Sequence, residues 1–540
     1  MDSDADLQLH GTTRILTENE HVKLVPEPTD SPNDPLNWSP ARKYWHASLV
    51  LLITGFTAGT SNDAGAAGDA MLAELNIDYA VQNTAAGVLF IGIGYWTLLA
   101  SPMTSLYGRR IMYLICLLFS LIGAIWFAKI MTIQDAIWCQ LFVGASESCA
   151  EALVQLSLSD MFYQHQRGMV LGLYVFATSA GTFLGPLIAG YIANDNWRWV
   201  GWTAAIITGI LLFVFYFGLE ETVFHRETIL GRKPDTANEN IATVDPAEFK
   251  LPIEMQSAPQ LTTGLDEEKG SQAGSATMRA PERPRTYWEK IALITPAPNL
   301  IGLGIKQYLW RLFCTLRILW FPAVVFSGLQ WGAQDAWLSF YLTVEEDNWY
   351  NPPWNYGNAA VAIMNVPTLI GATIGCVYGG WWSDRFVRWM ASKRNGIAEA
   401  EDRLWLLLPS AIINPVGLIL FGVGSNNGWN WPIPYVGLGF IGFGWGCAGD
   451  LSMAYLMDAY PDMVLEGMVG VAVINNSLAC IFTFCCSLWL NASGLSNTFI
   501  AIGVLSFFIQ LLTLPMLKWG KAFRRLTTKQ YREFLRIRDG

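Results

Sequence analysis

The sequence predicts an all-α membrane protein whose twelve transmembrane helices form two six-helix bundles. Hydrophobic residues make up 52% of the 540 residues and charged residues only 14%, outside the range of soluble globular proteins. Apolar stretches of membrane length recur along the chain, and a long polar segment divides them into two groups of six. These observations indicate a two-bundle protein embedded in a lipid bilayer.

Each apolar stretch is long enough to cross a membrane, since a spanning helix needs roughly 20 mostly apolar residues. The first six spans are expected at 45–64, 81–102, 110–129, 135–159, 168–193 and 198–219. The second six are expected at 319–343, 357–382, 404–424, 433–458, 467–490 and 495–517.

Polar segments mark the domain boundaries. Between the sixth and seventh spans Pro, Glu, Ser, Thr and Gly dominate and hydrophobic periodicity disappears, a composition typical of disorder. The predicted organisation is a cytoplasmic tail at 1–43, a bundle at 44–219, a largely disordered cytoplasmic linker at 220–306, a second bundle at 307–518 and a basic cytoplasmic tail at 519–540.

Lys and Arg accumulate on one side of the membrane if the spans alternate in direction. They occur at Arg109, Arg110 and Arg167, and within 226–233, 385–403 and 518–538. Because basic loops stay in the cytoplasm, we expect both termini and the linker there. We expect a multi-pass monomer of the plasma membrane.

The fourth span carries a polar stripe on an otherwise apolar helix. Gln140, Gly144, Glu147, Glu151 and Gln155 recur at helical spacing. A charged side chain at the bilayer centre costs roughly 2.5–3.5 kcal/mol on insertion scales, so such residues usually face a bundle interior or a water-filled cavity. The two carboxylates are either structural, being protonated or paired with a neighbouring helix, or form a proton-exchanging site.

Further polar residues are candidates for the same proton-coupling site or substrate cavity. Asp450 lies in the tenth span, Asp335 in the seventh and Asn475 in the eleventh, while Asp63 ends the first. Asp335 and Asp63 face either the cavity or the outer interface. Trp331, which could stack on a flat ligand, fits an interfacial aromatic belt better.

The two halves of the chain repeat weakly. The segment 101–110 after the second span aligns with 380–389 after the eighth, so that Arg109 is matched by Arg388. Parallel repeats of this kind are typical of two-bundle secondary transporters, whose substrate site lies between the halves.

A glycine-proline array occupies the fifth span. Gly181, Gly185 and Gly190 remove side-chain bulk and permit close helix approach, while Pro186 frees a backbone carbonyl and kinks the helix. Close packing alone explains the array, and a gating hinge is the alternative.

These stretches resemble the major facilitator superfamily, and within it the fungal twelve-span drug:proton antiporter group. The loop after the second span keeps the motif residues Gly108, Arg109 and Arg110 but has Ser101 and Ser105 where Gly and Asp are usual. The remaining motif residues are Gly380, Asp384, Arg385 and Arg388 after the eighth span, and Gly181, Gly185, Pro186 and Gly190 in the fifth.

The resemblance covers nearly the whole chain and implies the major facilitator fold. It also implies a cytoplasmic gate at the two loop motifs and a helix-packing antiporter motif in the fifth span. Arg109 and Arg110 fit either a gate or simple anchoring by positive charge. With Ser105 in place of Asp, the charge relay of the gate is incomplete in the N-terminal half.

Other functional classes are disfavoured. There is no phosphate-binding G-x4-G-K-[ST] run for ATP, no basic face for nucleic acid, and the five His residues are scattered. We therefore expect no enzyme, no cofactor and no metal. The predicted partners are a small organic substrate, protons and the lipid bilayer.

The predicted function is proton-coupled export of a small organic compound, drug-like or a fungal secondary metabolite, by alternating access. In this mechanism Glu151, coupled to Glu147, binds a proton from outside, and its inward release excludes substrate occupancy. An uptake permease for organic cations such as polyamines is the main alternative, which a cavity lined by acids would suit. A non-transporting membrane receptor is a remoter one.

Overall fold

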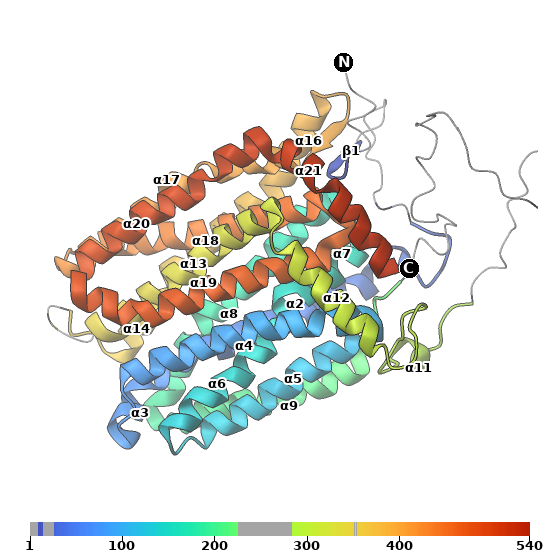
Figure 1. Ribbon diagram of the computed structural model, residues 1–540. Helices are drawn as coiled ribbons and strands as arrows, with labels where there is room; N and C mark the ends of the chain where they lie inside the picture. Colours follow the sequence, from blue (N-terminus) through green and yellow to red (C-terminus); the bar gives the residue numbers. More distant parts are fainter. Residues whose placement is uncertain are drawn as a thin grey trace, which may run out of the picture.

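Long helices lie side by side and make up most of the protein (Figure 1). The computed structural model describes residues 9–14, 26, 28–224, 283–349, 352 and 354–539. One end of the helix array holds the short helix α3 (Gly68–Leu75), and is here termed the α3 end. The opposite end holds the strand β1 (Thr12–Arg14) and the helix α16 (Ser383–Ser392), and is here termed the basic end.

The first six expected spans are all helical. They are α2 (Pro40–Asn62), α4 (Tyr79–Tyr107), α5 (Arg110–Ala128), α6 (Ile133–Ser148) with α7 (Val154–Met161), α8 (Arg167–Asn196) and α9 (Arg198–Gly218). Local signals fix where these helices begin. The Asp78 side chain accepts a hydrogen bond from the Val81 N–H (2.9 Å) and caps α4, and Thr132 and Asp135 form a capping box at α6.

The second six expected spans are also helical. They are α13 (Pro322–Asn348), α14 (Asn358–Ile363) with α15 (Asn365–Val377), α17 (Ser410–Asn426), α18 (Ile433–Ala459), α19 (Val464–Ser493) and α20 (Leu495–Leu511). Among the described residues, 7 single helices are each long and apolar enough to cross a membrane. The number of such spans rises to 8 if a bent pair of helices is counted as one span. The other spans are more polar or are broken into shorter pieces.

Two spans contain a π-helical turn. The turn η3 (Cys149–Leu153) joins α6 to α7, and the turn η5 (Tyr378–Trp382) joins α15 to α16. A π-turn inserts an extra residue into the helix and so rotates the next helical segment about the axis. Both turns lie in spans that line the contact between the two halves.

The helix packing repeats between the halves, which confirms the predicted two six-helix bundles. In the first half α2 packs on α8, α4 on α6, and α5 on α9. In the second half α13 packs on α19, α15 on α18, and α17 on α20. The bundles meet where α4 packs against α19 and where α8 packs against α15 and α18.

Two of the three glycines in the fifth-span array bring α8 against α2. A Cβ at Gly181 would lie 2.0 Å from the Gly55 carbonyl oxygen, and one at Gly185 would lie 2.6 Å from the Gly59 Cα. A Cβ at Gly190 would meet nothing within 4 Å. The backbones of α2 and α8 therefore touch at the first two glycines, and Gly190 has no such contact.

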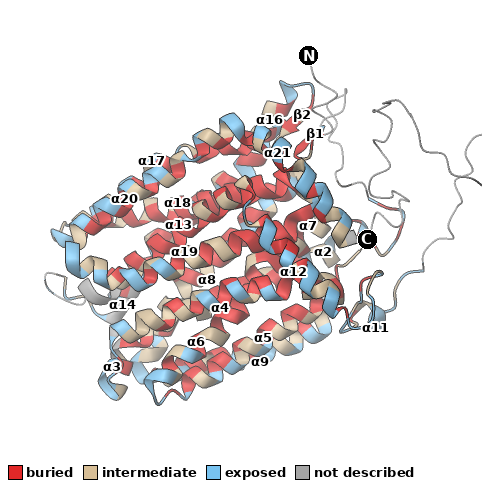
Figure 2. Ribbon diagram, in the orientation of Figure 1, coloured by how far each residue is buried: buried red, intermediate tan, exposed pale blue. Residues whose placement is uncertain are grey.

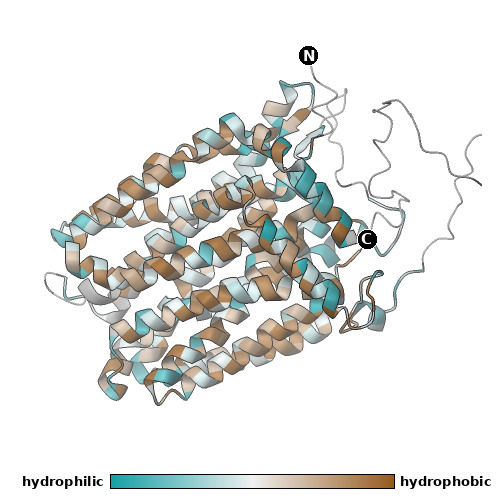
Figure 3. Cartoon of the chain, viewed as in Figure 1, coloured by the Kyte–Doolittle hydropathy of each residue, from teal (hydrophilic) through white to brown (hydrophobic). Residues whose placement is uncertain are grey.

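Large apolar side chains remain exposed on the outer helices, as expected for lipid contact. On α9, Ile206, Ile210 and Phe213 are exposed, and on α20 so is Phe508. Buried residues concentrate on helix faces inside the bundles (Figure 2). Hydrophilic residues gather at the basic end, notably on α21 (Thr513–Asp539) (Figure 3).

The expected linker and tail contain more structure than predicted. Residues 225–282 lie outside the described residues, but 283–304 pack on the first bundle, where the Ala297 N–H donates to the Leu106 carbonyl (2.9 Å). The helix α12 (Ile305–Ile318) then meets α13 at a bend of 78°. In the N-terminal tail, β1 pairs in antiparallel fashion with β2 (Ile397–Glu399).

Candidate functional site

A cavity of about 1230 Å³, including its open mouth, lies between the two bundles. Residues of α2, α4, α6 and α8 line one wall, and residues of α13, α18 and α19 line the other. Ala64, Gly65 and Met71, which lie at the α3 end, belong to the lining. The cavity therefore opens toward the α3 end.

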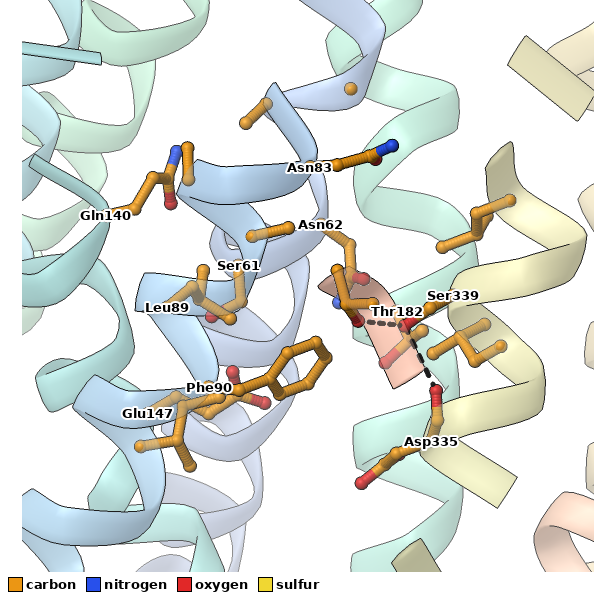
Figure 4. Close-up of a pocket in the computed structure, with 18 of the residues that line it drawn as sticks. Ser61, Asn62, Asn83, Leu89, Phe90, Gln140, Glu147, Thr182, Asp335 and Ser339 are labelled. Atoms are coloured by element: carbon orange, nitrogen blue, oxygen red, sulfur yellow. Dashed lines mark hydrogen bonds between the residues drawn. The ribbon is translucent and has the colours of Figure 1, made fainter. Parts of the chain in front are cut away.

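Three carboxylates line this cavity, and they come from both bundles. Glu147 of α6 and Glu151 of η3 belong to the first bundle, and Asp335 of α13 belongs to the second. Figure 4 shows Glu147 on one wall and Asp335 on the facing wall. Glu147 and Asp335 are only 9% and 7% exposed, so little water surrounds them.

The carboxylates form one electrostatic group. Glu151 interacts electrostatically with both Asp335 and Glu147. Among the described residues that line the cavity, none is Lys, Arg or His. The site therefore holds up to three negative charges without a cation among its described lining residues, an arrangement that attracts protons and cationic groups.

Polar side chains near Asp335 connect two helices of the second bundle. The Thr483 hydroxyl of α19 donates to the Ser339 hydroxyl of α13 (2.9 Å), which donates in turn to the Asp335 carbonyl oxygen (3.3 Å). Figure 4 draws the bond between Ser339 and the Asp335 carbonyl oxygen. These bonds hold the segment of α13 that carries the carboxylate.

Two tryptophans form an aromatic part of the lining. Trp331 of α13 and Trp445 of α18 have ring centroids 4.7 Å apart at 59°. Neither indole N–H has a hydrogen-bond partner among the described residues. Trp331 is buried, so the prediction that it belongs to an interfacial belt is wrong. Aromatic faces beside carboxylates suit a cationic guest.

Four predicted site residues do not line the cavity. Asp63 borders a separate small pocket with Ser120 and Gln140. Asn475 is buried and not part of the lining, but its side chain interacts with the cavity carboxylates Glu151 and Asp335. Gln155 is also buried, with its amide 3.5 Å from the Met453 sulfur. Gln155 does not face the cavity because the turn η3 rotates α7 relative to α6 and so moves Gln155 off the polar stripe.

Asp450, the fourth, lies against backbone at the seam between the bundles. It is fully buried, and neither carboxylate oxygen has a hydrogen-bond partner among the described residues. Its neighbours include Gly172 of α8 and Gly379 of η5.

A buried ion network closes the basic end between the bundles. The N–H groups of Gly168 and Met169, at the start of α8, donate to the Asp384 carboxylate (3.2 and 2.9 Å). Arg403 pairs with Asp384 (2.9 Å) and with Asp458 (2.7 Å). Asp384 thus sits at a helix N-terminus, where backbone N–H groups and the helix dipole favour an anion.

A second link crosses the same seam. Arg167 of the first bundle pairs with Asp458 of the second (3.1 Å), and the Arg167 guanidinium also donates to the Met457 carbonyl (3.0 Å). All four ionic side chains of the network are buried. The basic end is therefore sealed while the α3 end is open.

Within the described ranges, the other motif residues of the second bundle make no hydrogen bond or ion pair across the seam. Arg385 lies over the Trp381 ring (3.4 Å), and Arg388 donates to the Asp384 carbonyl of its own helix (3.2 Å). Gly380 does touch the other bundle, because a Cβ there would lie 2.9 Å from the Gly168 carbonyl oxygen.

Arg109 and Arg110 organise the basic end of the first bundle. The Glu221 carboxylate accepts their backbone N–H groups (3.0 and 3.1 Å to Oε2), and Arg109 pairs with Asp160. The buried Arg110 guanidinium donates to the Leu219 carbonyl (3.0 Å). Gly108 adopts φ of +104°, and a Cβ there would lie 2.6 Å from the Glu221 carboxylate, so this turn requires glycine.

Sequence reasoning missed Arg403, Trp445 and Asn476. Arg403 stood among the basic residues that precede the ninth span, and its pairing with two distant acids has no local signal in the sequence. No group of three or more His, Cys, Asp or Glu that could hold a metal ion occurs within the described part of the chain.

Comparisons with known proteins agree with this geometry. The family model of the Major Facilitator Superfamily matches residues 48–484. An uncharacterized MFS-type transporter of Schizosaccharomyces pombe is 50% identical over 98% of this chain and 95% of its own. Protein HOL1 of Saccharomyces cerevisiae is 50% identical over 98% of this chain and 94% of its own.

More distant proteins are similar in sequence or in structure. A probable drug/proton antiporter of Saccharomyces cerevisiae, YHK8, is 22% identical over 88% of this chain and 84% of its own. Among solved structures, the human organic anion transporter MFSD10 covers 88% of this chain and 100% of its own with a TM-score of 0.54 at 14% identity.

Proposed function

The chain belongs to the major facilitator superfamily of secondary transporters, and from that premise we propose that it is a proton-coupled permease for organic cations. The observation that carries this proposal is the central cavity. It holds Glu147, Glu151 and Asp335 without a basic residue among its described lining residues.

An acidic cavity with low-dielectric walls concentrates cations and repels anions. Because Asp335 lies on the wall opposite Glu147, a substrate with two amino groups suits the site better than one with a single charge. Trp331 and Trp445 add aromatic surface for the alkyl chain or for cation–π contact. Linear diamines and polyamines fit this description.

Proton coupling is assigned to Glu151, with Glu147 as its partner. Three interacting carboxylates cannot all stay ionised in a partly buried site without a counter-cation, so the site takes up a proton together with the cationic substrate. Glu151 lies in the turn η3, and such turns are frequent at functional sites. One carboxylate carries the proton while the others bind the substrate.

The orientation follows from the distribution of basic residues. Arg109, Arg110, Arg167 and the basic helix α21 all lie toward the basic end, which we therefore place in the cytoplasm with both termini. On this assignment the conformation is outward-open, and the Arg167, Arg403, Asp384 and Asp458 network is the closed inner gate. Rocking of the bundles would break this network and open the cavity inward.

Export of a drug-like compound or secondary metabolite is the second candidate. It is supported by the likeness to YHK8, a probable drug/proton antiporter, at 22% identity. The glycine contacts between α2 and α8 also fit the helix-packing motif of antiporters. The acidic cavity favours the first candidate, since a neutral aromatic compound would form no ion pair with the three carboxylates.

The test is accumulation of radiolabelled compounds in cells with and without the protein, across external pH. The panel contains monoamines, linear diamines and triamines, and neutral aromatic compounds. Higher accumulation of the diamines, dependent on the proton gradient, supports the cation permease. Lower accumulation of neutral aromatic compounds makes the protein an exporter, and no change for any compound contradicts transport of either class.

A further inference from the structure

Asp450 is a buried carboxylate that the central cavity does not use. It lies in α18, is 0% exposed, and is absent from the cavity lining. Neither of its side-chain oxygens has a hydrogen-bond partner among the described residues. An ionised carboxylate without a hydrogen-bond partner in such surroundings is strongly disfavoured, so the neutral, protonated form occupies this conformation.

Glycines from both bundles surround this carboxyl group. A Cβ placed on Gly172 of α8, or on Gly379 or Gly380 of η5, would lie 3.1 Å from the Asp450 Oδ2 atom. Gly172 belongs to the first bundle, whereas Gly379, Gly380 and Asp450 belong to the second. The carboxyl group is therefore buried by the contact between the bundles and not by its own bundle alone.

The same contact is held shut by the inner gate. Gly168, one helical turn before Gly172 on α8, donates its N–H to Asp384. Separation of α8 from α16 and η5, which must accompany rupture of this bond, removes the cover from Asp450. Opening of the gate and hydration of Asp450 are thus one structural event.

Groups of both charge signs lie near Asp450, and Arg403 is the cation among them. Arg403 and Asp384 interact with it electrostatically, and so do the thiols of Cys376 on α15 and Cys447 on α18. The glycines of α8 and η5 present only backbone to it. When the gate opens, Arg403 stays in the second bundle with its partners Asp384 and Asp458, so a cation remains near the Asp450 carboxyl group.

We propose that Asp450 is the group from which the coupled proton leaves to the cytoplasm. The step is a simple proton transfer from the Asp450 carboxyl group to water in the opened gate, and no other bond changes. This inference rests on the proposed proton-coupled function and adds a second protonation site to it. Glu151 takes part at the cavity and Asp450 at the gate, so the proton crosses the seam in two stages.

The test compares full-length wild-type protein with the D450N variant in proteoliposomes, with labelled 1,4-diaminobutane as the probe. Two assays are run: accumulation driven by a pH gradient, and exchange of labelled for unlabelled diamine at equal pH. Because D450N has no proton to release at this position, its rate of gradient-driven accumulation should fall at least tenfold. Its rate of diamine exchange should stay near that of the wild-type protein. The matched control is D462N, which removes an exposed carboxylate from the same end and should behave as wild type.

Gradient-driven accumulation by D450N at the wild-type rate would overturn the inference. The proposed function fails differently, because wild-type protein would then show no pH-dependent diamine flux at all. If D450N is inactive in both assays, the variant cannot separate a folding defect from loss of proton release. Labelling of the wild-type protein by a hydrophobic carbodiimide, which reacts with protonated carboxyl groups, then tests the inference. An Asp450 adduct that forms faster in transporting protein, measured by peptide mass spectrometry, supports the inference, and no adduct at Asp450 contradicts it.

Discussion

Arg167 of the first bundle and Asp458 of the second form a buried ion pair of 3.1 Å across the seam between them. Arg403 extends this pair to Asp384, which accepts the first N–H groups of α8. The basic end is therefore closed by charges whose partners come from both halves. Such a contact is strong when intact and costly when one member is lost, which suits a two-state gate.

Removal of Arg403 should destabilise the closed gate. The R403A variant leaves Asp384 and Asp458 buried without their shared cation, and loss of one partner of a buried pair costs about 3–5 kcal/mol. The expected result is a lower midpoint of thermal unfolding in detergent. The control R385A removes a guanidinium that lies over Trp381 outside the network, and its midpoint should stay close to wild type. Equal midpoints for R403A and R385A would contradict the assigned network.

The glycine contacts of α8 give a matched pair of variants. G181A places a methyl group 2.0 Å from the Gly55 carbonyl oxygen, and overpacking of this kind typically costs about 1–3 kcal/mol. G190A adds the same methyl group where nothing lies within 4 Å. Thermal unfolding should therefore begin at a lower temperature for G181A only. An equal loss in both variants would show that the array acts through helix flexibility and not through close packing.

The N-terminal segment should detach from the second bundle in acid. His10 packs between the rings of Tyr460 and Tyr531. Burial, with added repulsion from Arg524 and Arg532, lowers the pKa of His10 to about 4 from its ordinary value of 6.5. Because the docked pKa is lower, docking is at full strength above pH 6.5 and weakens as the pH falls toward 4.

Hydrogen exchange of residues 9–14 at pH 7.5 and pH 5 measures this detachment. The H10F variant keeps a ring at this position but cannot take up a proton, so comparison at each pH removes the intrinsic pH dependence of exchange. Wild-type protein should lose protection relative to H10F at pH 5 only. The same ratio of protection at both pH values would rule out a role for His10 protonation.

We expect the Asp335 carboxylate to give the site a higher affinity for dications than for monocations. The D335N variant removes the carboxylate of the second bundle and leaves Glu147 and Glu151 on the facing side. A hydrogen bond to a charged group is worth about 1.5–3 kcal/mol, so the apparent affinity for a linear diamine should fall roughly tenfold or more. A monoamine of similar length, which needs only one carboxylate, should lose much less. Competition assays against labelled diamine give both values, and equal losses would exclude a two-point site.

The bundles and the acidic stripe were predictable from the sequence because hydrophobic length and helical spacing are local properties. Glu147 and Glu151 were found in this way, and Asp335 was found because an acid within a span is rare. The fate of Gln155 was not predictable, since the turn η3 that rotates it has no clear signal in the sequence. Arg403 was missed for another reason: its partners Asp384 and Asp458 are brought together only by the packing of three elements.

The tail and linker illustrate a similar limit. Pro-rich and polar composition predicted disorder up to residue 306, yet 283–304 form backbone hydrogen bonds with the first bundle. The strand β1 pairs with β2, a partner more than 380 residues away in the chain. Composition reports how a segment behaves alone, whereas these segments are ordered by surfaces that the rest of the fold supplies.

The most direct test of the central claim is diamine transport by the E151Q variant in proteoliposomes under an imposed pH gradient. Glutamine keeps the size of the side chain and removes the exchangeable proton, so pH-driven accumulation of labelled 1,4-diaminobutane should be lost. The control E74Q neutralises a glutamate that pairs with Arg198 at the α3 end, outside the cavity lining, and should transport as wild type does. Accumulation by E151Q at the wild-type rate at every pH would contradict the assignment of proton coupling to this cavity.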